Sequence, residues 1–272
     1  PARYSLRMNR NGPPLEDLRR DIDAVDDGLL DLLVRRGALV AEVGRGKSGS
    51  GAPIYRPARE AEIMRRLLQR LSESGEKDRV VRIWRALMAA SYERQGGLRV
   101  VADPQVEWQA IGHFYPRARP PAEESQVALA RVRAGAADLA VVRTPTPFSP
   151  TPWLEAMVAA RAAGEPVFVL GRIPFFVMAG RDEQEALVVG RGHADPSGDD
   201  VTLVAAPAPV PPAGAVRVWY GELPGGLSLF AYAEYVKPDD PRLAGAGAVW
   251  LGTYPRPLDP SGPRAVEFGL RP

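Results

Sequence analysis

The stretch LEDLRRDIDAVDDGLLDLLVRRGALVAEVGRGK, residues 15–47, predicts one long amphipathic helix. Pro13 and Pro14 precede it, and Glu16 and Asp17 place negative charge in its first turn, where the helix dipole favours it. At 1.5 Å per residue the helix is roughly 50 Å long. Such a helix needs a partner along its whole apolar seam, so the sequence predicts a dimer formed through it. The seam alternates spacings of three and four: Leu15, Leu18, Ile22, Val25, Leu29, Leu32, Leu39 and Val43.

Two further helices are expected after the first one. The second begins at Pro57, which suits the first helical position, and is expected to end at Ser74 and Gly75. The third covers about residues 77–95. Its apolar face consists of Val80, Val81, Ile83, Trp84, Leu87 and Met88. The first hundred residues therefore read as a three-helix, all-α domain.

A cation interrupts the apolar seam of the first helix. Position 36 continues the register of Leu15, Ile22 and Leu29, yet the residue is Arg36. A buried guanidinium is costly unless it is paired, so one interpretation is an anion-binding site inside the helical bundle. An arginine that pairs with an acid of another helix, or that reaches solvent, fits the position equally well. Lys47 lies three turns further on, on nearly the same side.

The other two helices also place polar groups near their apolar faces. Ser91 and Gln95 continue the stripe of the third helix at i, i+4 spacing, although an exposed helix end explains them too. Arg59 and Glu60, near the start of the second helix, also fit a solvated surface pair. Taken together, the cationic and amide groups predict a pocket that binds a small dianion and acts by position and electrostatics.

Composition narrows the range of functions. The chain has 272 residues, enough for two or three compact units, and is 45% hydrophobic and 25% charged, as is usual for soluble proteins. A net charge of +2 gives no argument for nucleic acid or membrane partners. With no cysteine, and with His113 and His193 as the only histidines, we expect neither a metal site nor a catalytic triad. No apolar run is long enough to span a membrane, and we expect a cytoplasmic protein.

The helical segments resemble a known family. LEDLRRDIDAVDDGLLDLLVRRGALVAEVGRGK, APIYRPAREAEIMRRL and IWRALMAASYERQ are similar to the three helices of AroQ-class chorismate mutases, over about residues 15–95. The resemblance includes an LRxxID opening, an RxxLaxxVgxxK stretch and an RE pair. It implies an intertwined homodimer that rearranges chorismate to prephenate in a pericyclic step. It also implies that no cofactor, metal or covalent intermediate is needed.

The resemblance assigns roles to eight residues. Arg36, and Arg19 from the other protomer, match the arginines that bind the substrate carboxylates, for which a planar guanidinium is well suited. Lys47 and Gln95 match the pair that hydrogen-bonds the ether oxygen, and Glu60 matches the ligand of the substrate hydroxyl. Arg59 supports Glu60, and Ser91 matches a further carboxylate contact. Arg56 departs from the pattern, because many members have aspartate at this position near the substrate hydroxyl.

After Gly96 and Gly97 the composition changes to short Val- and Ala-rich segments separated by prolines, which predicts an α/β portion. This portion resembles, weakly but in order, the prephenate dehydratase and the ACT domain that some bacterial relatives fuse to the mutase. RTPTP, residues 143–147, stands where the dehydratase has its ENS motif, and Gln184, Glu185 and Ala186 replace its catalytic Thr-Arg-Phe. The ESRP effector motif is also missing. We therefore expect no dehydratase activity and the following domains: a mutase domain at 12–97, a degenerate dehydratase-like region at 98–192 and a degenerate ACT-like region at 193–272.

Two other functions remain open at this stage. Isochorismate pyruvate lyase uses the same fold, and a silenced mutase could serve as a non-catalytic binding or regulatory protein. The order of the C-terminal segments favours the mutase, since it points to phenylalanine and tyrosine synthesis. The C-terminal region could dock a partner enzyme, bind an effector, or simply pack against the mutase dimer.

Overall fold

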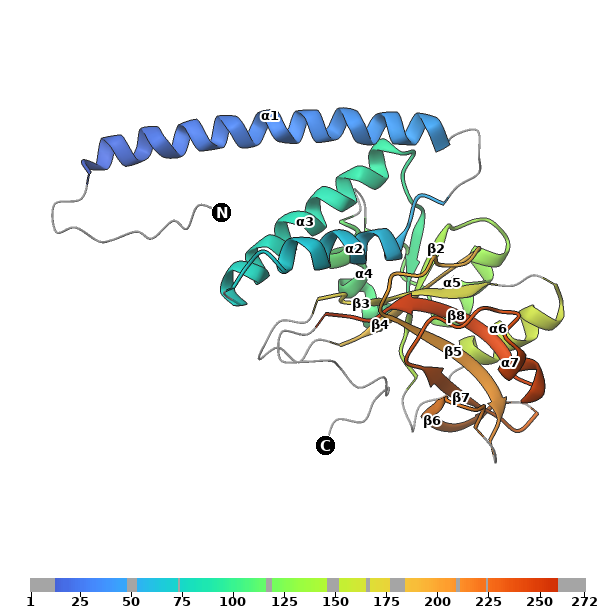
Figure 1. Cartoon of the computed structure of the whole chain (residues 1–272). Coiled ribbons are helices and arrows are strands. Elements are labelled where there is room, and N and C mark those ends of the chain that lie inside the picture. Colours follow the sequence, from blue (N-terminus) through green and yellow to red (C-terminus); the bar gives the residue numbers. More distant parts are fainter. Residues whose placement is uncertain are drawn as a thin grey trace. The chain divides into compact units, whose positions relative to one another are not determined.

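The computed structural model describes residues 13–47, 53–72, 74–115, 119–145, 152–164, 167–176, 184–208, 211–223 and 225–258 (Figure 1). Contacts between residues divide the chain into two compact units, Pro1–Gly51 and Ala52–Pro272. In the described part of the chain, no helix is both long enough and apolar enough to cross a membrane.

The described part of the first unit is a helix, α1, at Leu15–Lys47, with the bounds that the apolar periodicity predicts. Glu16 and Asp17 lie in its first turn. Its large apolar side chains are exposed; Leu29 and Leu32, for example, are 52% and 62% exposed. An apolar seam that is exposed to solvent is stabilised when a partner buries it.

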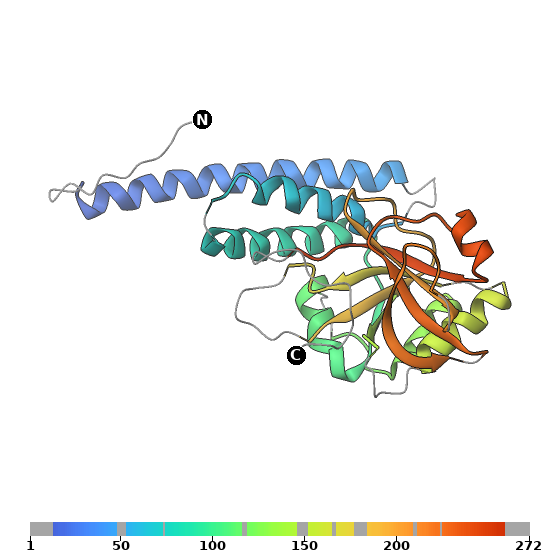
Figure 2. The ribbon, with the colours of Figure 1, turned by 60° about the horizontal axis from the view of Figure 1, so that its bottom comes forward.

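The second unit begins with a helical hairpin of α2, Pro57–Leu68, and α3, Ser74–Arg94 (Figure 2). Pro57 occupies the first turn of α2 as predicted. The prediction that Ser74 and Gly75 stop the second helix is wrong: α2 ends at Leu68, and Ser74 begins α3. Serine and glycine suit either end of a helix, so their presence alone does not distinguish a stop from a start.

The rest of the second unit is an α/β structure, as predicted. Its strands are β1 (Val100–Ala102), β2 (Leu139–Arg143), β3 (Phe168–Ile173), β4 (Ala186–Gly190), β5 (Asp200–Pro207), β6 (Val216–Leu223), β7 (Leu227–Tyr232) and β8 (Val249–Pro255). Its helices are the 3₁₀ turn Pro104–Val106, α4 (Glu107–Phe114), α5 (Ser125–Arg133), α6 (Pro152–Ala162) and α7 (Pro241–Gly245). The segments expected to form a helix and a strand at 125–142 do so in α5 and β2.

All eight strands belong to one mixed sheet in the order β1-β2-β4-β3-β8-β5-β7-β6. The pairs β1–β2 and β3–β8 are parallel, and the other neighbours are antiparallel. The last strand, β8, therefore lies between β3 and β5 in the middle of the sheet. Sheet pairing continues across residue 193, where the sequence predicts a boundary; the predicted domain limits stay a prediction.

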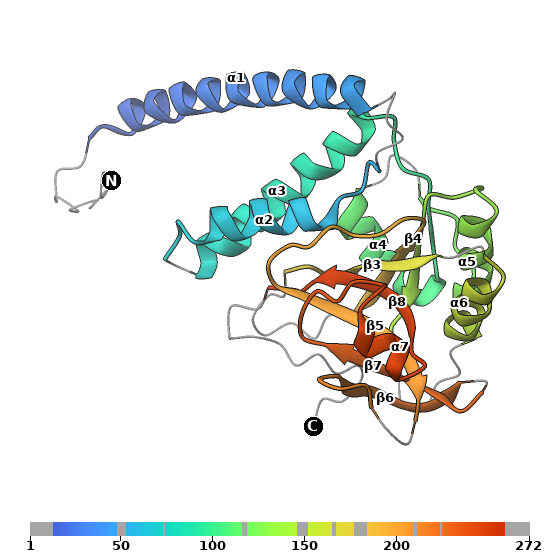
Figure 3. The ribbon, with the colours of Figure 1, turned by 45° about the vertical axis from the view of Figure 1, so that its right-hand side comes forward.

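Helices cover both faces of the sheet (Figure 3). Successive strand residues point to opposite faces, so Val142 packs in the core with α5 and α6, whereas Val141 packs in the core with α4. The second core also includes Tyr55, before α2, and Tyr92 of α3. The α2–α3 hairpin also has a small core of its own, formed by Met64, Leu68, Val81 and Met88 with Phe176.

The join between β3 and β8 depends on a glycine. Gly252 pairs with Val169 and has a φ of +141°, a conformation that side chains disfavour. A Cβ at this position would lie 2.9 Å from the carbonyl carbon of Val169, and closer still to its backbone nitrogen and oxygen. The two strands can therefore approach this closely only because residue 252 has no side chain.

Candidate functional site

Three of the eight predicted site residues lie on α1. Arg19 is exposed, and its Nη1 donates a hydrogen bond of 2.8 Å to Oε1 of Glu16. Arg36 is half-buried, and burial lowers the pKa of its guanidinium. Lys47 is the last residue of α1, and its side chain lies outside the described part of the structure. Arg19 and Arg36 are about 25 Å apart along the helix, too far to bind one small substrate from the same chain.

The other five predicted residues belong to the second unit, and two of them lie on its surface. Nη2 of Arg56, just before α2, lies 2.8 Å from Oδ2 of Asp195, and both side chains are largely exposed. Nη1 of Arg59 lies 2.9 Å from Oε2 of Glu62, one turn further along α2. Exposed ion pairs of this kind contribute little to stability.

Glu60, by contrast, is mostly buried between helices. Nη2 of Arg85, on α3, donates to its Oε2 at 2.6 Å, and the side chains of the two residues are only 12% and 10% exposed. The hydroxyl of Tyr92, also on α3, donates to the other carboxylate oxygen. Both oxygens of Glu60 are therefore held by α3, which fixes the carboxylate in one orientation.

The same guanidinium also reaches α4. Nη1 of Arg85 lies 2.9 Å from Nε2 and 3.2 Å from Nδ1 of the buried His113. Burial, and then the charge of Arg85, holds the pKa of His113 well below its usual range, so this ring is neutral. Burial is the largest single effect on Arg85 and acts to lower its pKa, but the charge and hydrogen bond of Glu60, together with Tyr92 and Tyr55, outweigh it, and the net shift is upward. Burial, reinforced by Glu60, raises the pKa of Tyr92.

The last two predicted residues lie one turn apart at the end of α3. The Ser91 hydroxyl donates to the carbonyl of Leu87 at 2.6 Å, and Nε2 of Gln95 donates to the carbonyl of Ser91 at 3.0 Å. Their i, i+4 spacing places both on one face of the helix, as the sequence predicts. The structure thus brings Ser91, in the last turn of α3, together with Gln95, which directly follows the helix, and it fixes Glu60 against α3. It leaves Arg56 and Arg59 in separate surface ion pairs.

Sequence reasoning missed Arg85 and Tyr92, the partners of Glu60, and His113, which contacts Arg85. A signal for Arg85 was available, because it occupies the buried seam of α3 formed by Val81, Met88 and Tyr92 at spacings of three and four. Arg85 thus interrupts the apolar seam of α3, as Arg36 interrupts the apolar seam of the first helix. No comparable signal pointed to His113, since its role depends on how α4 packs against α3.

Two charged residues at the positions predicted to replace the dehydratase motifs form ion pairs in the structure. Nε of Arg143, at the end of β2, lies 3.1 Å from Oδ2 of the buried Asp103, which also accepts hydrogen bonds from the backbone and hydroxyl of Ser125. Glu185, just before β4, pairs with the buried Arg172. Residues 146–147 of the predicted segment lie outside the described residues. Each described charge is matched by a neighbour of opposite sign.

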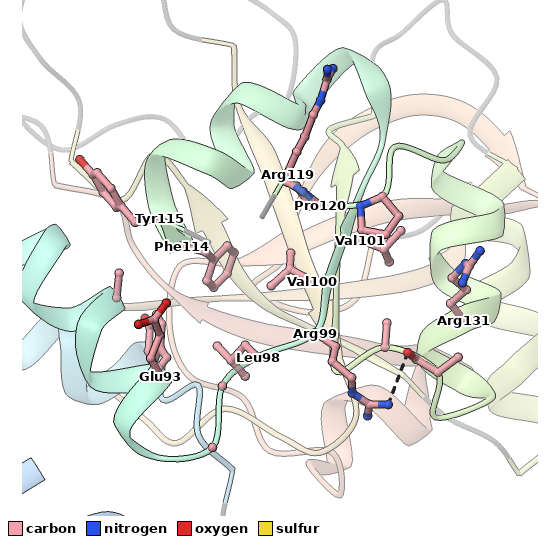
Figure 4. Close-up of a pocket in the computed structure, with 17 residues that line it drawn as sticks. Glu93, Leu98, Arg99, Val100, Val101, Phe114, Tyr115, Arg119, Pro120 and Arg131 are labelled. Carbon is pink, nitrogen blue, oxygen red and sulfur yellow. Dashed lines mark hydrogen bonds between the residues drawn. The ribbon is translucent and has the colours of Figure 1, made fainter. Parts of the chain in front are cut away.

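A cavity of about 580 Å³ opens beside the outer edge of β1 (Figure 4). Val100 and Phe114 form part of its apolar floor. Arg99, Arg119 and Arg131 surround it, and each pairs with a carboxylate, those of Asp138, Glu107 and Glu123. Because the three guanidinium groups are neutralised, and none of the eight predicted residues lines the cavity, we assign it no catalytic role.

Among the described residues there is no group of three histidine or acidic side chains placed to hold a metal ion. The chemistry that these side chains offer is hydrogen bonding and charge. Glu60 offers a fixed acceptor, and the arginines offer donors for anions.

Comparison with known proteins identifies the helical segment. Residues 18–96 match the family "Chorismate mutase type II". The T-protein of Enterobacter agglomerans is 58% identical over 50 residues, 18% of this chain and 13% of that protein. The bifunctional chorismate mutase/prephenate dehydratase of Aquifex aeolicus is 32% identical over 90 residues, 32% of this chain and 25% of that protein. The chain thus spans at most a quarter of these two relatives, and the predicted mutase domain at the N-terminus is confirmed.

A solved structure also resembles the chain, at a low level. The prephenate dehydratase of Arthrobacter aurescens in complex with L-Phe has a TM-score of 0.36 and 16% identity, and the match covers 61% of this chain and 92% of that one. This likeness is too slight to support an argument about the α/β portion.

Proposed function

We propose, from the match of residues 18–96 to the chorismate mutase type II family, that the chain is an enzyme that rearranges chorismate to prephenate. The observation that carries the proposal is the family match itself, because all eight predicted site residues lie inside the matched segment. We also propose that the enzyme acts in the cytoplasm, in phenylalanine and tyrosine biosynthesis.

The proposed reaction is a single pericyclic step. The ether C–O bond breaks as a new C–C bond forms, so neither a proton donor nor a nucleophile is required. Arg36, with Arg19 of the other protomer, binds the two carboxylates and holds the substrate in its compact conformer. Lys47 and Gln95 donate hydrogen bonds to the ether oxygen, where negative charge grows in the transition state.

Glu60 binds the substrate hydroxyl in this proposal. A carboxylate has about four lone-pair sites, and Arg85 and Tyr92 occupy one on each oxygen. The remaining sites can accept the hydroxyl proton while Arg85 keeps the carboxylate in place. Arg85 is thus proposed as a positioning residue, one that acts through Glu60.

The proposed assembly is an intertwined homodimer formed through α1. The exposed apolar seam supports this assembly, as does the 25 Å separation of Arg19 and Arg36 along one helix. A second chain buries the seam and brings its own Arg19 to the pocket.

The test is a chorismate-disappearance assay on the full-length protein. We expect Arg36→Ala to lower kcat/KM by about 10²–10³, because it removes a preorganised donor to a substrate anion. Arg20→Ala is the matched control, since Arg20 is an exposed arginine of the same helix that pairs with Asp17. If Arg36→Ala and Lys47→Ala both turned over chorismate at the unmodified rate, the assigned pocket would be wrong. Faster release of pyruvate from isochorismate would identify a lyase instead.

A further inference from the structure

Helix α4, Glu107–Phe114, lies outside the segment 18–96 that matches the mutase family, yet it packs against α3 of that segment. Both helices belong to the second compact unit. The side chains of Ala110, His113 and Phe114 on α4 are buried. None of the eight predicted site residues lies on α4, and the proposed reaction has no role for this helix.

His113 of α4 contacts the guanidinium that orients Glu60. Nη1 of Arg85 lies 2.9 Å from Nε2 and 3.2 Å from Nδ1 of His113, while its Nη2 donates to Glu60 at 2.6 Å. Both ring nitrogens are within hydrogen-bond distance of Nη1, so the unprotonated nitrogen of the neutral ring can accept in either tautomer. Because a guanidinium is planar and rigid, a partner that fixes Nη1 also fixes the direction of Nη2.

The second donor to Glu60, the hydroxyl of Tyr92, also belongs to a side chain that α4 contacts. The ring of Tyr92 packs against Phe114 of α4, with 6.1 Å between ring centroids, and against Tyr55 at 6.3 Å. Tyr55 in turn packs edge-on against Phe114 at 5.4 Å and against His113 at 6.2 Å. Aromatic pairs at these separations favour particular ring orientations. Both donors to Glu60 are therefore held by contacts with α4.

These contacts restrict where the Glu60 carboxylate can point. Arg85, Tyr92 and His113 are all buried, and side chains in a close-packed interior occupy single rotamers. A group that binds a substrate has to be held within about 0.5 Å of its productive position, and neighbouring side chains supply that constraint. For Glu60 the constraint comes directly from α3 and, one contact further out, from α4.

We propose that His113 is a positioning residue of the mutase site, which holds Arg85 and, through Arg85, keeps the Glu60 carboxylate directed at the substrate hydroxyl. The inference rests on the proposed function and deepens it. The α/β portion then contributes to the mutase reaction through α4, and the functional mutase unit extends beyond residue 96 to at least residue 113.

Steady-state kinetics of chorismate turnover by the full-length protein test the proposal. His113→Leu fills a similar space but offers no acceptor, and we expect it to raise KM by about tenfold and to change kcat by less than about threefold. The reason is that the substrate hydroxyl takes no part in bond breaking, so its contact strengthens binding in the ground and transition states alike. His113→Gln keeps an acceptor for Arg85 and should hold KM within about threefold of the unmodified value.

Val132→Ala is the control for a general loss of packing. Val132 is buried on α5, in the core on the other face of the sheet, so its truncation should leave KM unchanged. In a Glu60→Gln background, His113→Leu should raise KM no further, because it acts through Glu60. An unchanged KM in His113→Leu, an equal rise in Val132→Ala, or a full additional rise in the Glu60→Gln background would each overturn the proposal.

A measurement without substrate separates failure of this inference from failure of the proposed function. Urea unfolding of His113→Leu, Glu60→Gln and the double variant should give a combined loss smaller than the sum of the single losses, since both changes act on Arg85. Chorismate turnover together with additive losses would overturn this inference and leave the proposed function intact. Absence of turnover in the unmodified protein would overturn the proposed function, and with it the role of His113 in the reaction, whatever the unfolding data show.

Discussion

At the scale of single residues, the ion pair between Glu60 and Arg85 offers a direct test of how the candidate site is held. Both side chains are nearly buried, and removing one partner leaves the other charge uncompensated. We expect Arg85→Met to lower the free energy of unfolding by about 3–5 kcal/mol, measured by urea denaturation. The double variant Glu60→Gln/Arg85→Met should recover much of that loss. Additive losses in the two single variants would show that the pair is not coupled.

A second prediction at this scale concerns pH. The folded state keeps His113 neutral, whereas the unfolded chain takes up a proton as the pH falls through the ordinary histidine pKa of 6.5. The unfolded state then binds more protons, so the free energy of unfolding falls with pH below 6.5, by up to about 1.4 kcal/mol per pH unit. His113→Gln keeps an acceptor for Arg85 but cannot titrate, so it should remove this slope between pH 6.5 and 5.

The comparison for this measurement is His193→Gln. His193 is exposed, and burial lowers its pKa too, but it packs against Phe168 and Trp250 rather than against an ion pair. Its replacement should change the pH slope less than His113→Gln does. Parallel stability curves for the unmodified protein and His113→Gln would contradict the neutral, buried state of His113.

At the scale of secondary-structure elements, α1 carries the prediction of a dimer. Leu29 lies in the exposed apolar seam, and Leu29→Glu should convert a dimer to monomers and abolish mutase activity, because a buried unpaired charge is costly. Ala24→Glu is the matched control, because Ala24 lies on the polar face with Asp17, Asp27 and Asp31. Light scattering checks the mass of each variant. A monomeric unmodified protein would rule out the proposed assembly.

The first helix and the start of the second could be predicted from the sequence, whereas the end of the second helix and the order of the strands could not. The bounds of α1 follow from a local repeat, and Pro57 marks the start of α2 by its backbone geometry alone. The insertion of β4 between β2 and β3, and of β8 between β3 and β5, depends on contacts between distant segments. Those contacts cannot be predicted from the sequence pattern of any single segment.

The same distinction applies to the candidate site. Arg36 was found because it interrupts the apolar register of the first helix, and Glu60 because it belongs to the RE pair of a family motif. Arg85 and His113 were not found, because their roles arise only when α3 and α4 pack together. The face of a helix on which a residue lies can be predicted from the sequence. Which residue of another helix it contacts can be seen only in the folded structure.

At the scale of the whole molecule, we predict that the α/β portion has no prephenate dehydratase activity. Glu185 lies where the sequence resemblance predicts a dehydratase's catalytic Thr-Arg-Phe, and it pairs with Arg172, while Arg143 pairs with Asp103. We expect the purified protein to form no phenylpyruvate from prephenate above the uncatalysed rate. An assay of phenylpyruvate absorbance checks this, with chorismate turnover in the same sample as proof of active protein. Appreciable phenylpyruvate would show that residues 184–186 have been misread.

The central place of β8 affects how the chain is made. Of the strands in the described residues, β8 at 249–255 is the last to emerge during synthesis, yet β3 and β5 both pair with it. Until then a nascent chain carries two open strand edges that face no partner, and such edges readily join other chains. In a chain that is truncated before residue 249 these two strand edges stay unpaired. Such truncated products should therefore accumulate in aggregates or depend on chaperones.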